Sequence, residues 1–351
     1  MLCYAFVRMN TRDAQREDWL QRALGTRPDC VTAASSDASF RRYFRVNQAS
    51  LSRIVMDAPP PQEDCRPFVH VTDVLRAAGL QVPRIFAADV DSGFLLLSDL
   101  GDEVYLDALT DSNCNELYQD AISALVQMQR RCDASLLPLY DSQRLRDEMQ
   151  LFIDWFWIQH LQLENIDEAA TILNAAFEFL INEALGQPQV FVHRDYHSRN
   201  LMVLEHDNPG ILDYQDAVLG PVGYDLVSLL RDVYVRWPQS RITSWVATYY
   251  ELASASKLLG GAPASAFTRW FDLIGVQRHL KIAGIFARLY YRDGKPRYLR
   301  DIALTLDYLL EVAARYVELA PMVKLLVAND VRALNRQRVE YIDAACHSTR
   351  R

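Results

Sequence analysis

Glycine is scarce in this chain. Only 13 of its 351 residues are glycine, about half of the roughly 7% that is usual in proteins. Neither of the two common glycine-built phosphate loops, G-x-G-x-x-G and G-x-x-x-x-G-K-[ST], occurs in the sequence. The two architectures that hold nucleotide phosphates with such loops are therefore excluded, and a nucleotide would have to be bound in another way.

Long apolar runs and paired cysteines are also missing. No run approaches the roughly 20 apolar residues of a membrane span, and residues 2–7 are too few for the apolar core of a signal peptide. The cysteines include no C-x-x-C pair, which is typical of reduced thiols rather than of a disulfide framework or a zinc site. We therefore expect a cytoplasmic protein that contacts no membrane.

Basic residues are outnumbered by acidic ones. The chain has 45 Asp and Glu against 37 Lys and Arg, which gives a net charge of -8. Such a balance argues against nonspecific binding of nucleic acid or anionic membranes, because both attract basic surfaces. Apolar residues make up 50% of the chain and charged residues 23%, as in an ordinary globular protein of one or two domains.

The first hundred residues differ in pattern from the rest. Helical periodicity covers residues 13–24 and 67–78, and a polar stretch at 32–39 is interpreted as a loop. The strands expected in this part lie at residues 43–46, 53–56 and 93–97. These elements predict a small antiparallel sheet.

Helical patterns dominate after residue 102, with three short apolar runs as the interruption. The expected helices cover residues 116–131, 144–163, 167–185 and most of 225–345; the apolar runs lie at 188–192, 201–204 and 210–212. The pattern predicts an α+β protein with residues 1–101 as an N-terminal lobe, residues 102–351 as a mainly helical C-terminal lobe, and a hinge near 98–102.

Dense polar residues follow the short apolar runs, which is unusual in a helical region. Asp195 and Asn200 stand five positions apart, and Asp213 follows the next run. Mg²⁺ prefers hard oxygen ligands, usually one or two carboxylates plus substrate phosphates. In phosphoryl transfer, Asp195 would orient the attacking hydroxyl and accept its proton, while Asn200 and Asp213 would hold the metal.

Two other interpretations fit part of this segment. Asp and Asn side chains commonly tie loops without any catalytic role. Alternatively, His193, Asp195 and His197 form a plausible zinc ligand set for a metallohydrolase. The zinc interpretation leaves Asn200 and Asp213 unexplained, so the spacing favours a kinase.

The same residues carry a family resemblance. Residues 193–200 (HRDYHSRN) with 211–217 (ILDYQDA) resemble the aminoglycoside phosphotransferase and choline kinase-like branch of the protein-kinase fold. Residues 220–226 (GPVGYDL) and 95–102 (LLLSDLGD) are similar to the family's following segment and to its hinge. The resemblance implies a protein-kinase-like bilobal fold that uses ATP and Mg²⁺, with the nucleotide bound by the N-terminal lobe.

The resemblance also implies roles for individual residues. Asp195 and Asn200 are implied to be catalytic, and His197 either steadies the γ-phosphate or ties the loop. Asn200 and Asp213 are implied to bind Mg²⁺. The nucleotide would be contacted by a phosphate-covering loop and by the hinge backbone, which involve Ser36, Asp37, Ser39, Ser98, Asp99 and Leu100.

Within the family, residues 36–45 (SDASFRRYFR), 55–60 (VMDAPP) and 287–295 (ARLYYRDGK), together with Arg199, resemble bacterial amino-sugar kinases of cell-wall recycling. This resemblance implies N-acetylmuramate and N-acetylglucosamine as small-molecule partners, phosphorylated on the anomeric C1 hydroxyl. A kinase of another small alcohol, such as an aminoglycoside or choline, is the alternative.

One departure from the family concerns a strand of the small lobe. Kinases place a phosphate-binding lysine there, and Val55-Met56-Asp57 offers none. Arg45 or Arg53 is a possible substitute, although a solvated strand face is the simpler interpretation of both. Glu63 or Asp64 would be the carboxylate of the usual ion pair, with no lysine to pair with. This gap leaves a noncatalytic nucleotide-binding protein as a further alternative.

Overall fold

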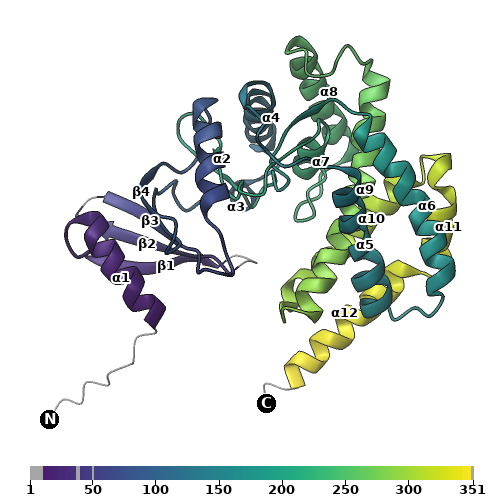
Figure 1. Ribbon diagram of the computed structural model, residues 1–351. Helices are drawn as coiled ribbons and strands as arrows, with labels where there is room; N and C mark the ends of the chain where they lie inside the picture. The colour runs from purple at the N-terminus through teal and green to yellow at the C-terminus, as the bar shows by residue number, and fades with distance from the viewer. Residues whose placement is uncertain (1–10, 37–39, 50, 349–351) are drawn as a thin grey trace.

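The computed structural model describes residues 11–36, 40–49 and 51–348. Its N-terminal part is a five-stranded antiparallel sheet of order β1-β2-β3-β5-β4 with two helices (Figure 1). The elements are α1 (Thr11–Leu24), β1 (Cys30–Ser36), β2 (Arg42–Gln48), β3 (Leu51–Asp57), α2 (Arg66–Ala77), β4 (Ile85–Asp89) and β5 (Phe94–Ser98). The predicted antiparallel sheet is confirmed.

Alternating side chains place an apolar layer on each face of this sheet. In β5, Phe94 and Leu96 pack with Trp19 of α1, whereas Leu95 and Leu97 belong to the large core that also contains α2. The stacked rings of Trp19 and Phe94 lie 5.5 Å apart. Successive residues of a strand face opposite sides, so one short apolar run covers both faces.

The predicted polar loop at 32–39 is wrong over residues 32–36, which form most of β1. This strand pairs antiparallel with β2, with a register shift between Ala33 and Ser35. It is an edge strand with exposed side chains at Thr32 and Ala33. Backbone pairing to one neighbour holds such a strand without any apolar alternation, which is why its polar sequence gave no strand signal.

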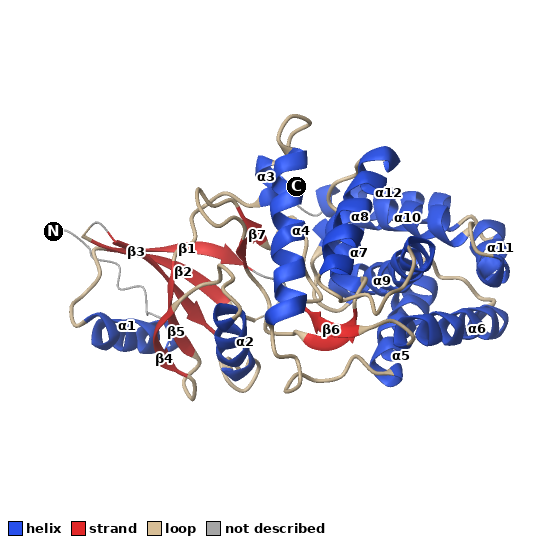
Figure 2. Cartoon of the chain, turned by 90° about the horizontal axis from the view of Figure 1, so that it is seen from above, coloured by secondary structure: helices blue, strands red, loops and turns tan. Residues whose placement is uncertain are grey.

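Helices make up most of the remaining chain, as expected (Figures 1 and 2). They are α3 (Tyr105–Ala108), α4 (Cys114–Arg131), α5 (Ser142–Leu151), the π-helix η1 (Phe152–His160), α6 (Ile166–Leu185), α7 (Tyr224–Leu230), α8 (Gln239–Ala255), α9 (Ala264–Tyr291), the 3₁₀ helix η2 (Pro296–Asp301), α10 (Ile302–Ala313), the 3₁₀ helix η3 (Val317–Leu319), α11 (Ala320–Ala328) and α12 (Val331–Ser348). The helix predicted over 144–163 is therefore α5 followed by a π-helical segment.

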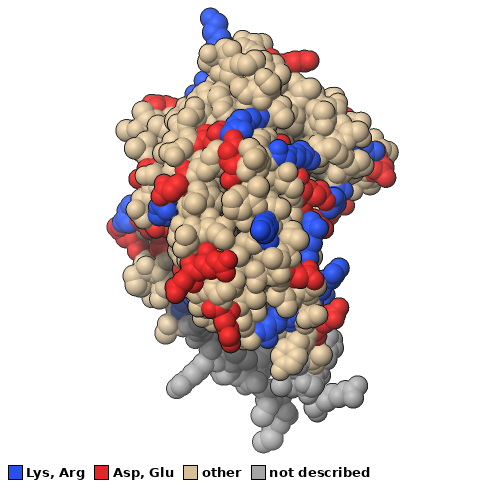
Figure 3. All heavy atoms as spheres, turned by 90° about the vertical axis from the view of Figure 1, so that its right-hand side faces the viewer, with Lys and Arg blue, Asp and Glu red and all other residues tan. Residues whose placement is uncertain are grey.

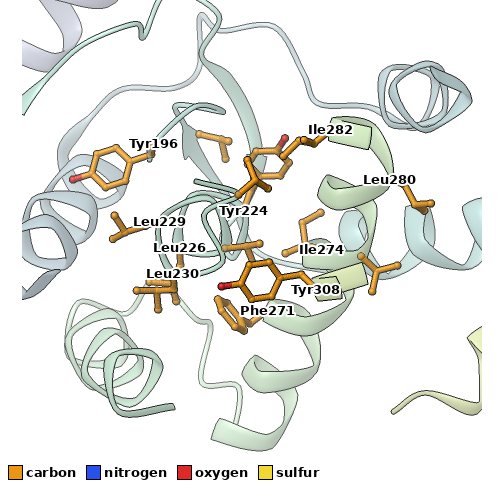
Figure 4. Packing of buried hydrophobic residues seen from close by; sticks show 14 of the residues in the cluster. Tyr196, Tyr224, Leu226, Leu229, Leu230, Phe271, Ile274, Leu280, Ile282 and Tyr308 are labelled. Atoms are coloured by element: carbon orange, nitrogen blue, oxygen red, sulfur yellow. The ribbon is translucent and has the colours of Figure 1, made fainter. Parts of the chain in front are cut away.

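The long helix α9 is the centre of the helical part. Most of its middle is buried, including Ile274, which lies on the side of Leu226 of α7 and Tyr308 of α10, and Leu280, which points away from them (Figure 4). At Gly284, an added Cβ would lie 2.3 Å from the carbonyl carbon of Leu151. A glycine is therefore needed where α9 crosses the junction of α5 and η1.

Four short strands hold the polar loops between sheet and helices. They are β6 (Gln189–Val192), β7 (Leu201–Met202), β8 (Gly210–Ile211) and β9 (Val218–Pro221). β6 pairs with β9 and β7 with β8, so residues 193–200 and 212–217 both connect one of these two-stranded sheets to the other. The three predicted apolar runs are confirmed as strands, and β9 was not predicted.

The large core is continuous from the sheet to the helices, since it includes Met56 and Leu97 as well as residues of α9. The predicted division into residues 1–101 and 102–351 stays a prediction. No helix of the described ranges combines the length and apolar character that a membrane crossing requires. Acidic and basic side chains are interspersed on the face formed by the C-terminal helices (Figure 3).

Candidate active site

His193 begins the polar loop after β6 and ties it to the loop after β8. Its Nε2 donates to the carbonyl oxygen of Leu212 at 2.9 Å, and its Nδ1 accepts from the backbone N–H of Asp195 at 3.2 Å. Burial lowers the pKa of His193 to about 4, so the ring is neutral at pH 7. Because both ring nitrogens bind backbone, His193 has no nitrogen left for a metal.

The zinc interpretation is therefore wrong for the residues that the structure describes. Among them, no group of three or more His, Cys, Asp or Glu side chains is arranged to hold a metal ion. His197 and Asp195 do not form such a group with His193, which acts as a structural link between the two loops.

Asp225, the first acidic residue of α7, anchors the same loop. Its two oxygens accept the backbone N–H groups of His193 at 2.7 Å and of Arg194 at 2.9 Å. Burial raises the pKa of Asp225 to about 7, against the effect of these two hydrogen bonds. Arg194 has a φ of 79°, a left-handed conformation that costs a non-glycine residue about 1–2 kcal/mol, so these bonds hold a strained backbone in place.

The side chain of Arg194 enters a buried charge network. Its Nη2 donates to Glu148 of α5, which also lies 3.3 Å from Nζ of Lys281 and accepts from the hydroxyl of Tyr140. Burial opposes ionisation of Glu148, but the charges of Lys281 and Arg194 outweigh it and lower its pKa. The network therefore fixes Arg194, the neighbour of Asp195, to two helices.

Asp195 is half-buried in this positive surrounding. Burial opposes its ionisation, and the charges of Lys281 above all, with His197 and Arg194, outweigh burial and lower the pKa of Asp195 to about 2. Its carboxylate is therefore ionised at neutral pH and is a hydrogen-bond acceptor for a hydroxyl group. This fits the role predicted for it, which stays a prediction.

Asn200 and Asp213 lie together at the end of this loop system. The side-chain amide nitrogen of Asn200 donates to the carbonyl oxygen of Asp195 at 2.9 Å. The backbone carbonyl oxygen of Asn200 accepts from the backbone N–H of Leu212, also at 2.9 Å. Asp213 has a φ of 61° and accepts from Nε2 of Gln215 at 2.8 Å. The resulting donors, an amide oxygen and a carboxylate, are hard ligands that fit Mg²⁺.

A cavity of about 680 Å³ opens between the sheet and the short strands. Asn200 and Asp213 line it, together with the predicted hinge residues Ser98, Asp99 and Leu100. Apolar side chains face it from both sides, Ile54 and Leu97 from the sheet and Met202 and Leu212 from the other side. Apolar walls of this kind suit the flat aromatic base of a nucleotide.

The other predicted site residues are placed less directly. Asp195 and His197 are not among the residues lining the cavity. Ser36 ends β1, two residues after the cavity residue Ala34, whereas Asp37 and Ser39 lie outside the described residues. The phosphate-covering role of this segment stays a prediction.

His197 contributes to the loop mainly through its backbone. Its N–H donates to the carbonyl oxygen of Asp195 at 3.1 Å, and its own carbonyl accepts from Asn200 at 2.9 Å. The ring meets Tyr234 edge-on at 5.4 Å. Within the described residues its Nδ1 is buried without a hydrogen-bond partner, so its predicted contact with the γ-phosphate stays a prediction.

Arg45 ties β2 to the predicted hinge. Its Nε and Nη2 donate to the Asp99 carboxylate at 2.6 and 3.0 Å, and Nη2 also donates to the carbonyl oxygen of Gly101 at 3.0 Å. An ion pair with Asp102 completes the contact. The hydrogen bond with Asp99 raises the pKa of Arg45. Arg53, the other suggested substitute for the lysine, stacks its guanidinium 4.7 Å from the Phe86 ring centre.

Two residues that support the loop 193–200 were not predicted from the sequence. Glu148 stands 46 positions before Arg194, and Asp232 accepts from both the hydroxyl and the N–H of Ser198, at 2.5 and 3.0 Å. Neither acidic residue lies in a recognisable motif. Both carboxylates are buried, and this burial, which only the fold reveals, is what identifies them.

Comparison with known proteins places the chain in a family. Residues 31–259 match the phosphotransferase enzyme family. The chain belongs to this family. A relative from Pseudomonas aeruginosa, named N-acetylmuramate/N-acetylglucosamine kinase, is 50% identical over 301 residues, which cover 86% of this chain and 89% of the relative. A relative of the same name from Neisseria meningitidis serogroup B is 41% identical and covers 90% and 95%.

Solved structures agree on the fold. An aminoglycoside phosphotransferase, APH(2'')-Ib with bound ADP, matches with a TM-score of 0.59 at 15% identity over 86% of this chain and 99% of its own. The choline kinase LicA from Streptococcus pneumoniae matches with a TM-score of 0.60 at 11% identity, over 88% and 100%. This phosphotransferase is therefore an ATP-dependent kinase with a protein-kinase-like fold.

Proposed function

We propose that this phosphotransferase transfers the γ-phosphoryl group of ATP, with Mg²⁺, to the anomeric C1 hydroxyl of N-acetylmuramate and N-acetylglucosamine. The observation that carries the proposal is that Asp195 and Asn200 share one loop and are linked by a hydrogen bond of 2.9 Å, while Asn200 and Asp213 of the neighbouring loop both line the cavity. The names of relatives at 41–50% identity support the choice of sugar. Such a cytoplasmic kinase would return sugars from degraded peptidoglycan to synthesis.

The low pKa of Asp195 suits an anomeric hydroxyl. A carboxylate with a pKa of about 2 is a weak base, so it orients the hydroxyl and takes its proton only as the bond to phosphorus forms. An anomeric hydroxyl releases its proton more readily than an ordinary alcohol, because the ring oxygen withdraws electrons. The C1 oxygen then bonds to the γ-phosphorus, the bond to the β,γ-bridging oxygen breaks, and ADP leaves.

The nucleotide occupies the 680 Å³ cavity in this proposal. The base lies between the apolar walls, near the hinge backbone at Ser98, Asp99 and Leu100. Asn200 and Asp213 hold Mg²⁺, which when bound neutralises charge on the phosphates. The segment from Ser36 onward, with Asp37 and Ser39, covers the phosphates. Residues 1–101 then act as the nucleotide-binding lobe, and residues 102–351 carry the catalytic loop and the acceptor site.

The acceptor is the part that an aminoglycoside or choline kinase would change. Arg199 and Arg297 line the cavity beside Asn200, and guanidinium groups bind carboxylates well. Arg199 lies 3.5 Å from the Tyr234 ring centre and Arg297 donates to the hydroxyl of Tyr298 at 2.8 Å. Two arginines fixed at the edge of the cavity suit an acidic sugar better than a cationic amine.

The test is release of ADP by the purified chain with Mg-ATP and each acceptor: both sugars, an aminoglycoside and choline. We expect turnover with the sugars and a product that no longer reduces copper(II), because a phosphate on C1 blocks the free anomeric end. Asp195→Asn should lower kcat by about 10²–10⁴-fold, the usual range for a positioned proton acceptor, while ADP still binds. No sugar-dependent ADP release, or a product that still reduces, would contradict the proposal.

A further inference from the structure

The strand lysine of kinases has no direct counterpart here, and the structure shows why the strand cannot supply one. Val55 and Met56 of β3 are fully buried in the two apolar layers. The buried carboxylate of Asp57 is paired with Arg12 at 2.7 Å and with Arg42 at 2.5 Å. Arg53 of the same strand stacks on Phe86 and does not line the cavity, so a cation for the ATP phosphates must come from outside β3.

Arg41 lies next to Asp213, which lines the cavity. It immediately precedes β2, its side chain is only 10% exposed, and its Nη2 lies 3.6 Å from Oδ1 of Asp213. Its Nε lies 3.7 Å from Oε2 of Glu63, in the turn before α2. One guanidinium group thus lies between the carboxylate proposed to bind the metal and a carboxylate beside the N-terminus of α2.

Glu63 is held so that it can orient this arginine. Its Oε1 accepts the backbone N–H of Phe40 at 3.0 Å, one residue before Arg41. The same carboxylate therefore contacts both the backbone and the side chain of this short segment. The sequence offered Glu63 or Asp64 as the carboxylate of an ion pair without a lysine, and in the structure Glu63 is paired with Arg41.

We infer that Arg41 takes the place of the strand lysine, binding phosphate oxygens of ATP beside Asp213, with Glu63 as its positioning residue. The contact between Arg41 and Asp213 is 3.6 Å long, beyond hydrogen-bond distance, so a phosphate oxygen can bind this guanidinium group beside Asp213. A guanidinium group also binds two phosphate oxygens at once. The inference rests on ATP as the phosphoryl donor and is independent of the acceptor.

The test measures binding of adenosine, AMP, ADP and a non-hydrolysable ATP analogue by calorimetry, with Mg²⁺ and without any sugar. For Arg41→Met we expect unchanged adenosine binding and a loss of about 10–100-fold for the ligands whose phosphates reach Arg41, the equivalent of one charge-assisted contact. Arg41→Lys keeps the charge and should recover part of this loss. Arg53→Met, a change of the same kind on β3, should leave the series unchanged.

Kinetic measurements show whether Arg41 and Glu63 act on ATP or only support the fold. Arg41→Met should lower kcat/KM for ATP by about 10–100-fold, on the same one-contact scale, with the KM for the acceptor unchanged. Glu63→Gln should give a smaller loss, and none in addition when Arg41 has already been replaced by methionine, because a positioning residue acts through its partner.

Two results would overturn the inference. One is an Arg41→Met variant that binds ADP and the ATP analogue as tightly as the original chain. The other is an equal loss of affinity for adenosine and ADP, which would mean that Arg41 merely supports the pocket. If Arg41→Met does not fold, judged by its melting curve, the comparison of Arg41→Lys with Arg53→Met decides by the same criteria. Because no acceptor is present in the binding series, a wrong choice of sugar would not affect it.

Discussion

Glu148→Gln tests whether the buried charge network positions the catalytic loop. Glu148 receives Arg194 of that loop, Lys281 of α9 and the hydroxyl of Tyr140. The change keeps the size and one acceptor oxygen of the side chain, but leaves two buried cations without their counter-charge.

The expected loss of stability follows from the burial of Glu148. Removing one partner of a buried ion pair costs about 3–5 kcal/mol of stability, and the new amide side chain would retain some hydrogen bonding, so about 3 kcal/mol is expected. Arg194, with its left-handed backbone, loses the carboxylate that its guanidinium group binds. Because a shift of 1 Å at a reacting group can cost about 10²-fold in rate, kcat should fall by about 10–100-fold. The KM for ATP should change little, since Glu148 does not line the cavity.

Asp272→Asn is a matched control. Asp272 is equally buried in the helical part and pairs with Arg231, with Arg315 at 3.5 Å and with the hydroxyl of Tyr316 at 2.9 Å. These partners lie in the helical part, outside the loop 193–200. The variant should lose similar stability to Glu148→Gln while keeping its kcat.

The stability that Glu148→Gln loses should be larger at neutral pH than in acid. The pKa of Glu148 is lowered in the folded state, where cations outweigh burial. Its contribution is therefore present above the unfolded pKa of about 4.3 and is lost as the pH falls through the lower folded pKa. Urea unfolding at pH 7 and near pH 4 should show the deficit of Glu148→Gln shrinking in acid. An unchanged kcat in Glu148→Gln, or an equal loss in Asp272→Asn, would refute the reasoning.

Three further predictions concern the metal, the acid range and the core. Asp213→Asn should raise the Mg²⁺ concentration for half-maximal activity by about tenfold or more, the loss of one charged ligand; an unchanged Mg²⁺ titration would contradict its role. Because the pKa of Asp195 is about 2, its contribution to the free energy of unfolding should be complete above about pH 4 and disappear toward pH 2. If Asp195→Asn shows the same dependence of stability on acid pH, the lowered pKa is contradicted. Gly284→Ala should destabilise by about 3 kcal/mol or more, since the new Cβ overlaps the backbone of Leu151, whereas Gly275→Ala meets only side-chain atoms and should cost less in the same urea titration.

Local patterns predicted most of the elements and the centre of the site. Apolar periodicity located α4 and α6 closely, and an apolar run of five residues located β5. The grouping of Asn200 with Asp213 at one cavity was also predictable, because both lie beside short strands that pair with each other. Such features depend on residues close in sequence, or on strands joined by a short connection.

Contacts between distant segments could not be predicted. The edge strand β1 is held by backbone pairing, which leaves no trace in side-chain polarity. Glu148 and Asp232 became visible as supports of the loop only when α5 and the end of α7 were packed against it. Several arginines lie close together in this part of the sequence, which does not distinguish Arg41 from Arg45. The fold distinguishes them, because it places Glu63 beside Arg41 and Asp99 beside Arg45.

The scarcity of glycine now has a structural counterpart in the site. Arg194 and Asp213 both adopt positive φ, 79° and 61°, a conformation for which glycine is the usual residue. Glycine cannot serve at either position, because Arg194 must reach Glu148 and Asp213 must present a carboxylate to the cavity. The strain of each residue is offset by contacts that also fix its direction, such as the bonds from Asp225 to the loop. A site without glycine loops therefore depends on buried charged side chains to hold its backbone, and those side chains lie far from the loop in the sequence.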